Sequence, residues 1–200
     1  MTTLTLVRHG QTDWNAQRRI QGSADIPLND TGREQAREAA AGLRHLVDGD
    51  PLVVVSSDLS RAHETALLIA AELGVDAPAT YPQLRERNYG EAEGLGIDEF
   101  HERWGDWHVA QVPGAETWTD VRTRALSGLR AAIRDARHAT APQAPSLIVV
   151  SHGALIRELI RHATGGAFPA EGERLANGSA HTFLMERDRL SLLSYAAYPA

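Results

Sequence analysis

The 200-residue sequence contains no cysteine and no lysine, and it has no long hydrophobic run. Without cysteine there is neither a disulfide framework nor thiolate chemistry, which favours a cytoplasmic protein. Without lysine, a Schiff-base nucleophile and the lysine of a P-loop are both excluded. Arg8 interrupts the only early apolar stretch, and no stretch approaches the ~20 apolar residues that span a bilayer. We therefore expect no membrane segment, no membrane partner and no secretory signal.

An excess of basic residues is also absent, because 20 arginines stand against 26 acidic residues and the formal charge is −6. A nucleic-acid-binding protein usually presents a net basic face, so we expect no nucleic-acid partner. The hydrophobic fraction of 42% is typical of a globular protein, and the length fits a single domain over residues 1–200. The sequence leaves the oligomeric state open, and a homodimer is compatible with it.

Strand and helix patterns alternate along the chain. Apolar, β-branched runs at 3–8, 52–55 and 146–151 predict buried strands. Such alternation predicts an α/β fold, here a three-layer α/β/α sandwich around a mostly parallel sheet. The interval 87–116 is the one candidate insertion and is expected to form a small lid.

The remaining elements follow from caps and periodicity. Asn29 or Asp30 is expected to cap a helix over 30–47, and Ser57-Asp58 a helix that ends at Gly74. Other helices are expected over 97–112 (with Trp104 and Trp107), 117–138 and 154–163, and a hairpin over 180–186 and 190–195.

Four polar residues lie just beyond the carboxyl ends of predicted strands. Arg8 and His9 follow the first strand, Arg61 begins the helix after the second, and His152 follows the strand at 146–151. Ligand sites in open α/β sheets form outside these strand ends, so two guanidinium groups and two imidazoles should converge. Arginine presents a planar fork suited to phosphate oxygens, and the helix after Gly153 points free amides the same way. The natural occupant of this site is a phosphoryl group.

The motifs around these residues resemble those of the histidine phosphatase superfamily, the phosphoglycerate-mutase-like fold. The first block is LVRHGQTDWN at 6–15, followed by RIQG at 19–22. The others are SDLSRAHETA at 57–66, LRERNYGEAEG at 84–94 and VSHG at 150–153. Together they match the family in order and spacing from residue 4 to at least 160, and they indicate its phosphatase branch.

The resemblance implies a covalent mechanism in which His9 attacks phosphorus and water hydrolyses the phosphohistidine. Arg8 and Arg61 should lower the pKa of His9 and favour its neutral, nucleophilic form. Arg8, Arg61 and His152 would hold the phosphoryl oxygens. The resemblance assigns further substrate or phosphate contacts to a group of seven residues: Asn15, Gln21, Gly22, Arg87, Tyr89, Gly153 and Ala154.

The leaving group needs a proton, which the family takes from a carboxylate that matches Glu86. From the residues alone, Glu86 competes with Glu91 and Glu93 of the same loop. The resemblance favours Glu86 as catalytic acid and base. The mechanism requires no metal and no cofactor, and the spacing of His101 and His108 matches no recognised pattern of metal ligands.

The superfamily contains phosphatases and mutases, and three functions remain open. A mutase needs additional cations away from the transferred phosphoryl, whereas the lid segment holds Asp98, Glu99, Glu102 and Asp106 against Arg103. We expect these acidic residues to repel a second phosphate, which favours a phosphomonoesterase that acts on small phosphorylated metabolites. The alternatives are a cofactor-dependent phosphoglycerate mutase and a phosphate-binding module without catalysis.

Overall fold

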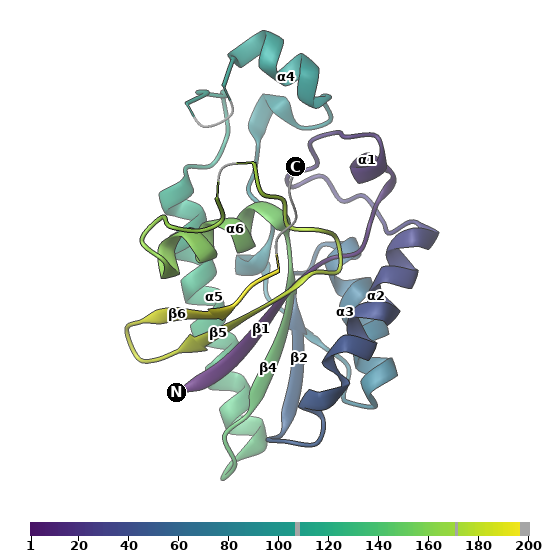
Figure 1. The fold of residues 1–200 in the computed structure, drawn as a ribbon, viewed down its shortest axis with the longest axis vertical. Coiled ribbons are helices and arrows are strands. Elements are labelled where there is room, and N and C mark those ends of the chain that lie inside the picture. The colour runs from purple at the N-terminus through teal and green to yellow at the C-terminus, as the bar shows by residue number, and fades with distance from the viewer. Residues whose placement is uncertain (107–108, 171, 197–200) are drawn as a thin grey trace.

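The computed structural model describes residues 1–106, 109–170 and 172–196. A single six-stranded sheet runs through the molecule with helices on both faces (Figure 1). Its strands are β1 (Thr2–Arg8), β2 (Leu52–Ser56), β3 (Ala79–Thr80), β4 (Ser146–Ser151), β5 (Ala180–Met185) and β6 (Leu190–Ser194). The α-helices are α1 (Asp13–Ala16), α2 (Asp30–Leu43), α3 (Ser60–Leu73), α4 (Ile97–Trp104), α5 (Trp118–Thr140) and α6 (Gly153–Ala163). Short 3-10 turns lie at η1 (Arg44–Leu46), η2 (Pro82–Leu84) and η3 (Gly90–Ala92).

The strand order is β3-β2-β4-β1-β5-β6. The pairings of β4 with β1 and β2, and of β2 with β3, are parallel, whereas β5 is antiparallel to both β1 and β6. The predicted α/β class is therefore confirmed, and the terminal hairpin adds the antiparallel edge. Parallel neighbours end on the same side of a sheet, so β1, β2 and β4 deliver their carboxyl ends to one edge.

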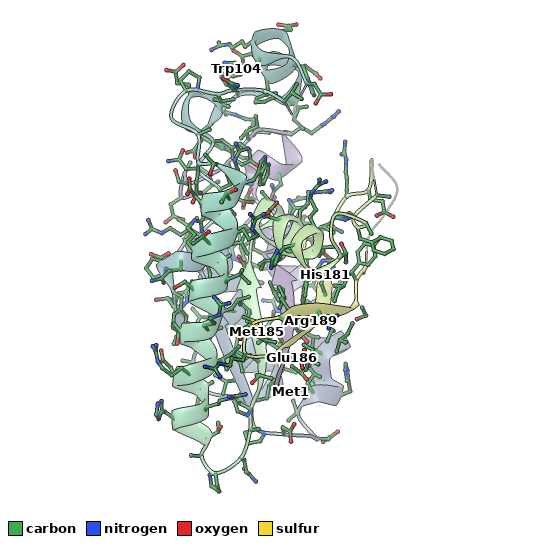
Figure 2. All side chains as sticks on the ribbon, turned by 90° about the vertical axis from the view of Figure 1, so that its left-hand side faces the viewer. Met1, Trp104, His181, Met185, Glu186 and Arg189 are labelled. Carbon is green, nitrogen blue, oxygen red and sulfur yellow. The ribbon has the colours of Figure 1, made fainter. Side chains whose placement is uncertain are left out.

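Two hydrophobic cores cover the two faces of the sheet. Alternate residues of β4 serve them in turn, because Leu147 and Val149 belong to the core under α5 and α6, while Ile148 and Val150 belong to the core under α2 and α3. Strands buried on both faces are apolar at every position, which explains the continuous apolar runs in the sequence. The edge-on view in Figure 2 shows α5 along almost the whole length of the sheet.

Some local predictions were wrong. Leu59, not Ser57-Asp58, is the N-cap of α3, because Asp58 instead pairs with Arg85 at 2.6 Å. Helix α2 begins after Asn29 as predicted, but it ends at Leu43 and gives way to η1. The lid helix stops at Trp104, where Gly105 adopts a φ of 74°, and Trp107 lies outside the described residues. The sequence patterns did not predict the short elements α1 and β3.

The lid helix α4 projects at one end of the molecule, beyond the carboxyl ends of the parallel strands (Figure 1). Phe100 holds it to Ile20, Tyr89 and Ala92 in a small third hydrophobic cluster. None of the described helices is both long and apolar enough to cross a membrane.

Candidate active site

The sheet brings His9 and His152 together. Arg8, the last residue of β1, is in register with Ser151, the last residue of β4. His9 and His152 directly follow these two residues and therefore lie side by side. Their ring centroids are 5.1 Å apart with an interplanar angle of 61°. Arg61 is the second residue of α3, which follows the neighbouring strand β2. The four residues that sequence analysis placed at strand ends therefore meet at one edge of the sheet.

His9 is buried, and its ring has a defined orientation. Its Nδ1 lies 2.7 Å from the carbonyl oxygen of Gly10, which can only accept a hydrogen bond, so Nδ1 carries the proton of the neutral ring. The lone pair is then on Nε2. Burial lowers the pKa of His9 well below its ordinary value, and the charges of Arg61 and Arg8 lower it further. His9 is consequently a neutral imidazole whose Nε2 is a free nucleophilic nitrogen.

His152 is fully buried, and neither ring nitrogen has a hydrogen-bond partner among the described residues. Burial lowers its pKa well below the ordinary value, and Arg61 and His9 contribute in the same direction. A buried polar group without a hydrogen-bond partner costs about 1–3 kcal/mol of folding free energy. A ligand that forms a hydrogen bond with the His152 ring would remove this cost.

Backbone carbonyls hold the guanidinium groups of Arg8 and Arg61, and the Nε donor of each remains unused. Arg61 donates from Nη1 to Ala24 at 2.7 Å and from Nη2 to Gly22 at 2.8 Å, while Arg8 donates from Nη1 to Leu175. The Nε atoms of both guanidinium groups are buried and have no partner among the described residues. Two cations and a neutral imidazole with unused donors form a site for a group with several negative oxygens.

The loop before α2 supplies the next wall. Gln21 and Gly22 line the pocket, and the buried Oε1 of Gln21 has no partner within the described part of the chain. Asn15 also lines the pocket, and its Oδ1 accepts a hydrogen bond from Asn177 Nδ2 at 3.2 Å. The same Asn177 group donates to the His9 carbonyl at 2.9 Å, which ties this loop to the residue after β1.

Of the three competing carboxylates, only Glu86 reaches the pocket. The Glu86 carboxylate packs against the N-terminus of α6, where it accepts hydrogen bonds from the amides of Ala154 at 3.0 Å and Leu155 at 3.2 Å. Glu93 instead accepts hydrogen bonds from Ser23, Ala24 and Tyr89 and joins two loops. Glu91 is exposed and does not line the pocket.

Gly153, Ala154 and Tyr89 line the pocket beside Glu86, whereas Arg87 does not. The Arg87 guanidinium stacks on the rings of Tyr89 and Trp118 at 4.8 and 4.3 Å, and its Nε donates to the Glu116 carbonyl. Arg87 therefore supports this wall of the pocket from behind, and a direct contact between Arg87 and substrate stays a prediction.

Arg124, which no sequence motif marks, holds the Glu86 loop in place. It binds the Glu116 carboxylate through two nitrogens at 2.6 and 2.8 Å, and it donates to the carbonyls of Gln83, Arg85 and Glu86. Its position on α5 carries no local motif, since the contact spans 38 residues of sequence. Only the packing of α5 against η2 reveals it.

The pocket has a volume of about 1400 Å³ and an arginine-rich wall. Three glutamates and eight arginines line it, the arginines being Arg8, Arg18, Arg19, Arg61, Arg122, Arg157, Arg161 and Arg174. From the lid helix α4, which is described over its whole length, Ile97 and His101 line the pocket. The acidic lid residues Asp98, Glu99, Glu102 and Asp106 do not line the pocket, and Glu99 pairs with Arg103, so their repulsion of a second anion stays a prediction.

No group of three or more His, Asp or Glu side chains within the described residues could hold a metal ion. His101 approaches the carbonyl of Gly105 through Nδ1 at 2.9 Å, and His108 lies outside the described residues.

The buried histidines should make stability depend on pH in a defined window. Their folded pKa values lie below the ordinary value of 6.5, so the unfolded chain binds more protons as the pH falls through 6.5, and stability is lost there. Burial lowers the pKa of His181 to about 4, so His181 alone is expected to reduce the free energy of unfolding by about 2 kcal/mol between pH 7.5 and pH 5. Urea unfolding at these two pH values should show a large loss.

The matched control is His181→Asn, because His181 is buried but does not line the pocket. This variant should lose less stability than the wild type over the same pH interval. Equal losses in both proteins would contradict the pKa assigned to His181.

Known proteins resemble this chain in sequence and in fold. A family model described as the histidine phosphatase superfamily (branch 1) matches residues 4–197. The uncharacterized phosphatase PhoE of Bacillus subtilis is 33% identical over 195 residues, which cover 98% of this chain and 94% of that protein. The probable phosphoglycerate mutase GpmB of Escherichia fergusonii is 34% identical over 182 residues, which cover 87% and 79%. A mycobacterial glucosyl-3-phosphoglycerate phosphatase, solved with VO3, matches with a TM-score of 0.81 and 30% identity over 99% of this chain and 100% of that one.

Proposed function

We propose that this chain, which belongs to the histidine phosphatase superfamily and is a phosphatase, hydrolyses small phosphate monoesters through a phosphohistidine on His9. The observation that carries the proposal is the neutral His9 ring, with Nδ1 bonded to the Gly10 carbonyl and Nε2 free beside Arg8, Arg61 and His152. A neutral imidazole is a nucleophile, and a cationic surround stabilises the charge on the phosphoryl oxygens as it is transferred.

In the first step, His9 Nε2 forms a bond to phosphorus while the bond from phosphorus to the ester oxygen breaks. Glu86, protonated, gives its proton to the departing oxygen, so an alcohol leaves. The unused donors of Arg8, Arg61 and His152 are the groups available to the three remaining phosphoryl oxygens.

In the second step, water attacks the phosphorus of phosphohistidine, and Glu86 accepts a proton from that water. The bond from phosphorus to Nε2 breaks, phosphate leaves, and both His9 and Glu86 return to their starting states. Because Glu86 sits at the amides of Ala154 and Leu155, its carboxylate has a defined position for both proton transfers.

A phosphoglycerate mutase is the second candidate, and two observations favour it. GpmB-type relatives match most of the chain, and the pocket wall holds more arginines than a single phosphoryl group requires. A mutase must retain a bisphosphorylated intermediate, whereas a phosphatase releases its product. The named phosphatases among the relatives and solved structures favour hydrolysis.

The deciding experiment measures phosphate release from 4-nitrophenyl phosphate in the presence of a chelator, beside the interconversion of 2- and 3-phosphoglycerate with and without 2,3-bisphosphoglycerate. We expect steady release of phosphate and no appreciable interconversion. Efficient interconversion that depends on bisphosphoglycerate would establish the mutase. Binding of phosphate esters with neither reaction would instead indicate a binding module.

Three statements remain predictions from the sequence: that the protein is cytoplasmic, that it has no nucleic-acid or membrane partner, and that it can form a homodimer. Light scattering on a size-exclusion column would test the homodimer.

A further inference from the structure

Arg18 adopts a backbone conformation that arginine rarely takes. Its φ is 56°, and it is the only non-glycine residue with a positive φ in the described ranges. This left-handed region costs free energy for any residue with a Cβ and favours glycine. The backbone is held there from both sides, because Arg18 N donates to Asn15 at 3.1 Å and its carbonyl accepts from Ile97 N at 3.3 Å. Strain of this kind concentrates at functional sites, and Arg18 lines the pocket.

Arg18, Arg161 and Arg174 share a second property, which is an uncommitted guanidinium group. Five of the eight pocket arginines donate to protein oxygens: Arg8 to Leu175, Arg19 to Gly94, Arg61 to Gly22, Arg122 to Glu158 and Arg157 to Glu173. For the other three, no side-chain hydrogen bond or ion pair is found within the described part of the chain. Three uncommitted cations on one pocket are a binding surface for negative charge.

Helix α6 sets how far this surface lies from the reacting phosphoryl. Its residues 153, 154, 157, 158, 161 and 162 line the pocket, a spacing that puts them on one helical face. Arg161 lies eight residues beyond Gly153, or about 12 Å along the helix axis. Helical side chains lean toward the N-terminus, which brings the Arg161 guanidinium back toward the site. Burial lowers the pKa of Arg157 and the charge of Arg161 lowers it further, so an anion between the two guanidinium groups would relieve their repulsion.

We propose that Arg18, Arg161 and Arg174 form a distal subsite for a second anionic group of the substrate. The preferred substrates are then phosphate monoesters that carry a carboxylate or a second phosphate about 6–12 Å from the reacting phosphorus. This inference rests on the proposed phosphatase function and specifies its substrate class. The large pocket volume of about 1400 Å³ fits such an elongated ligand better than a compact monoester.

Matched synthetic esters test the subsite. Octyl phosphate and 7-carboxyheptyl phosphate have similar length and differ in the terminal carboxylate, while 1,8-octanediol bisphosphate carries a phosphate there. Phosphoglycolate carries a carboxylate that is too close to the ester to reach the subsite. We expect kcat/KM for the long carboxylate ester to exceed that for octyl phosphate at least about tenfold, as a charged hydrogen bond provides. The bisphosphate arm shows whether carboxylate or phosphate is preferred.

Variants locate the effect. Arg161→Ala and Arg18→Gly should each lower the ratio of kcat/KM for the long carboxylate ester to that for octyl phosphate about tenfold. Arg189→Ala is the matched control, because Arg189 lies in the β5–β6 turn, far from α4 (Figure 2), and does not line the pocket. Arg18→Gly should also melt roughly 2–4 °C above Arg18→Ala, since glycine tolerates the left-handed backbone.

Equal kcat/KM for octyl phosphate and 7-carboxyheptyl phosphate in the wild type would overturn the subsite and leave the phosphatase intact. A ratio that survives both Arg161→Ala and Arg18→Gly would also overturn it. Failure to release phosphate from any ester would overturn the proposed function, and the subsite with it.

Discussion

Replacing His9 by alanine is expected to reduce phosphate release by roughly four orders of magnitude or more, because the variant lacks the nitrogen that forms the bond to phosphorus. The wild type, mixed with 32P-labelled substrate and denatured within milliseconds, should retain label that is stable to base and released by acid, as expected of a phosphohistidine. His9→Ala should retain none. Rapid-quench experiments followed by mass spectrometry of the labelled peptide would identify the residue.

The control for this experiment is His45→Ala, since His45 is an exposed histidine on η1 that does not line the pocket. It should retain both turnover and label. Label on a residue other than His9, or turnover by His9→Ala close to that of the wild type, would contradict the covalent mechanism.

Replacing Glu86 by glutamine is expected to have an effect that depends on the leaving group. Glutamine can still accept hydrogen bonds from the amides of Ala154 and Leu155, but it has no acidic proton to give. Hydrolysis of an alkyl phosphate, whose alkoxide needs a proton, should slow about 10²–10⁴-fold. Formation of phosphohistidine from 4-nitrophenyl phosphate should change far less, because 4-nitrophenolate leaves without protonation.

Rapid-quench measurement of the first step with both substrates separates these effects. Glu91→Gln is the matched control, because it removes a carboxylate from the same loop that does not line the pocket. An equal loss with both substrates would argue that Glu86 acts only by positioning other groups, and no loss with either would exclude it as the acid.

The sequence predicted the main strands and the site at their ends for a local reason. Strands buried on both faces must be apolar throughout, so a run such as Leu147–Val150 predicts a buried strand without any tertiary information. The residue that follows such a run lies at the edge of the sheet, and this rule was enough to pair His9 with His152 and to add Arg61. The choice among Glu86, Glu91 and Glu93 required the family resemblance, because all three occupy the same polar loop.

Predictions failed where the determining contact is distant in sequence. Asp58 was expected to cap α3, but its carboxylate pairs with Arg85, 27 residues further along the chain. The lid acids Asp98, Glu99, Glu102 and Asp106 do not line the pocket, and the sequence could not show this because it does not give the rotation of α4 about its axis. That rotation depends on Phe100, which packs into the cluster with Ile20, Tyr89 and Ala92.

The sequence by itself therefore determined the fold class and the strand ends that carry the candidate site, because these follow from local hydrophobic pattern and residue type. Only the tertiary structure decided which carboxylate reaches the pocket, that Arg124 anchors its loop, and that Arg18, Arg161 and Arg174 line the same pocket. These facts depend on contacts between segments tens of residues apart and on the rotation of helices, neither of which a local pattern encodes.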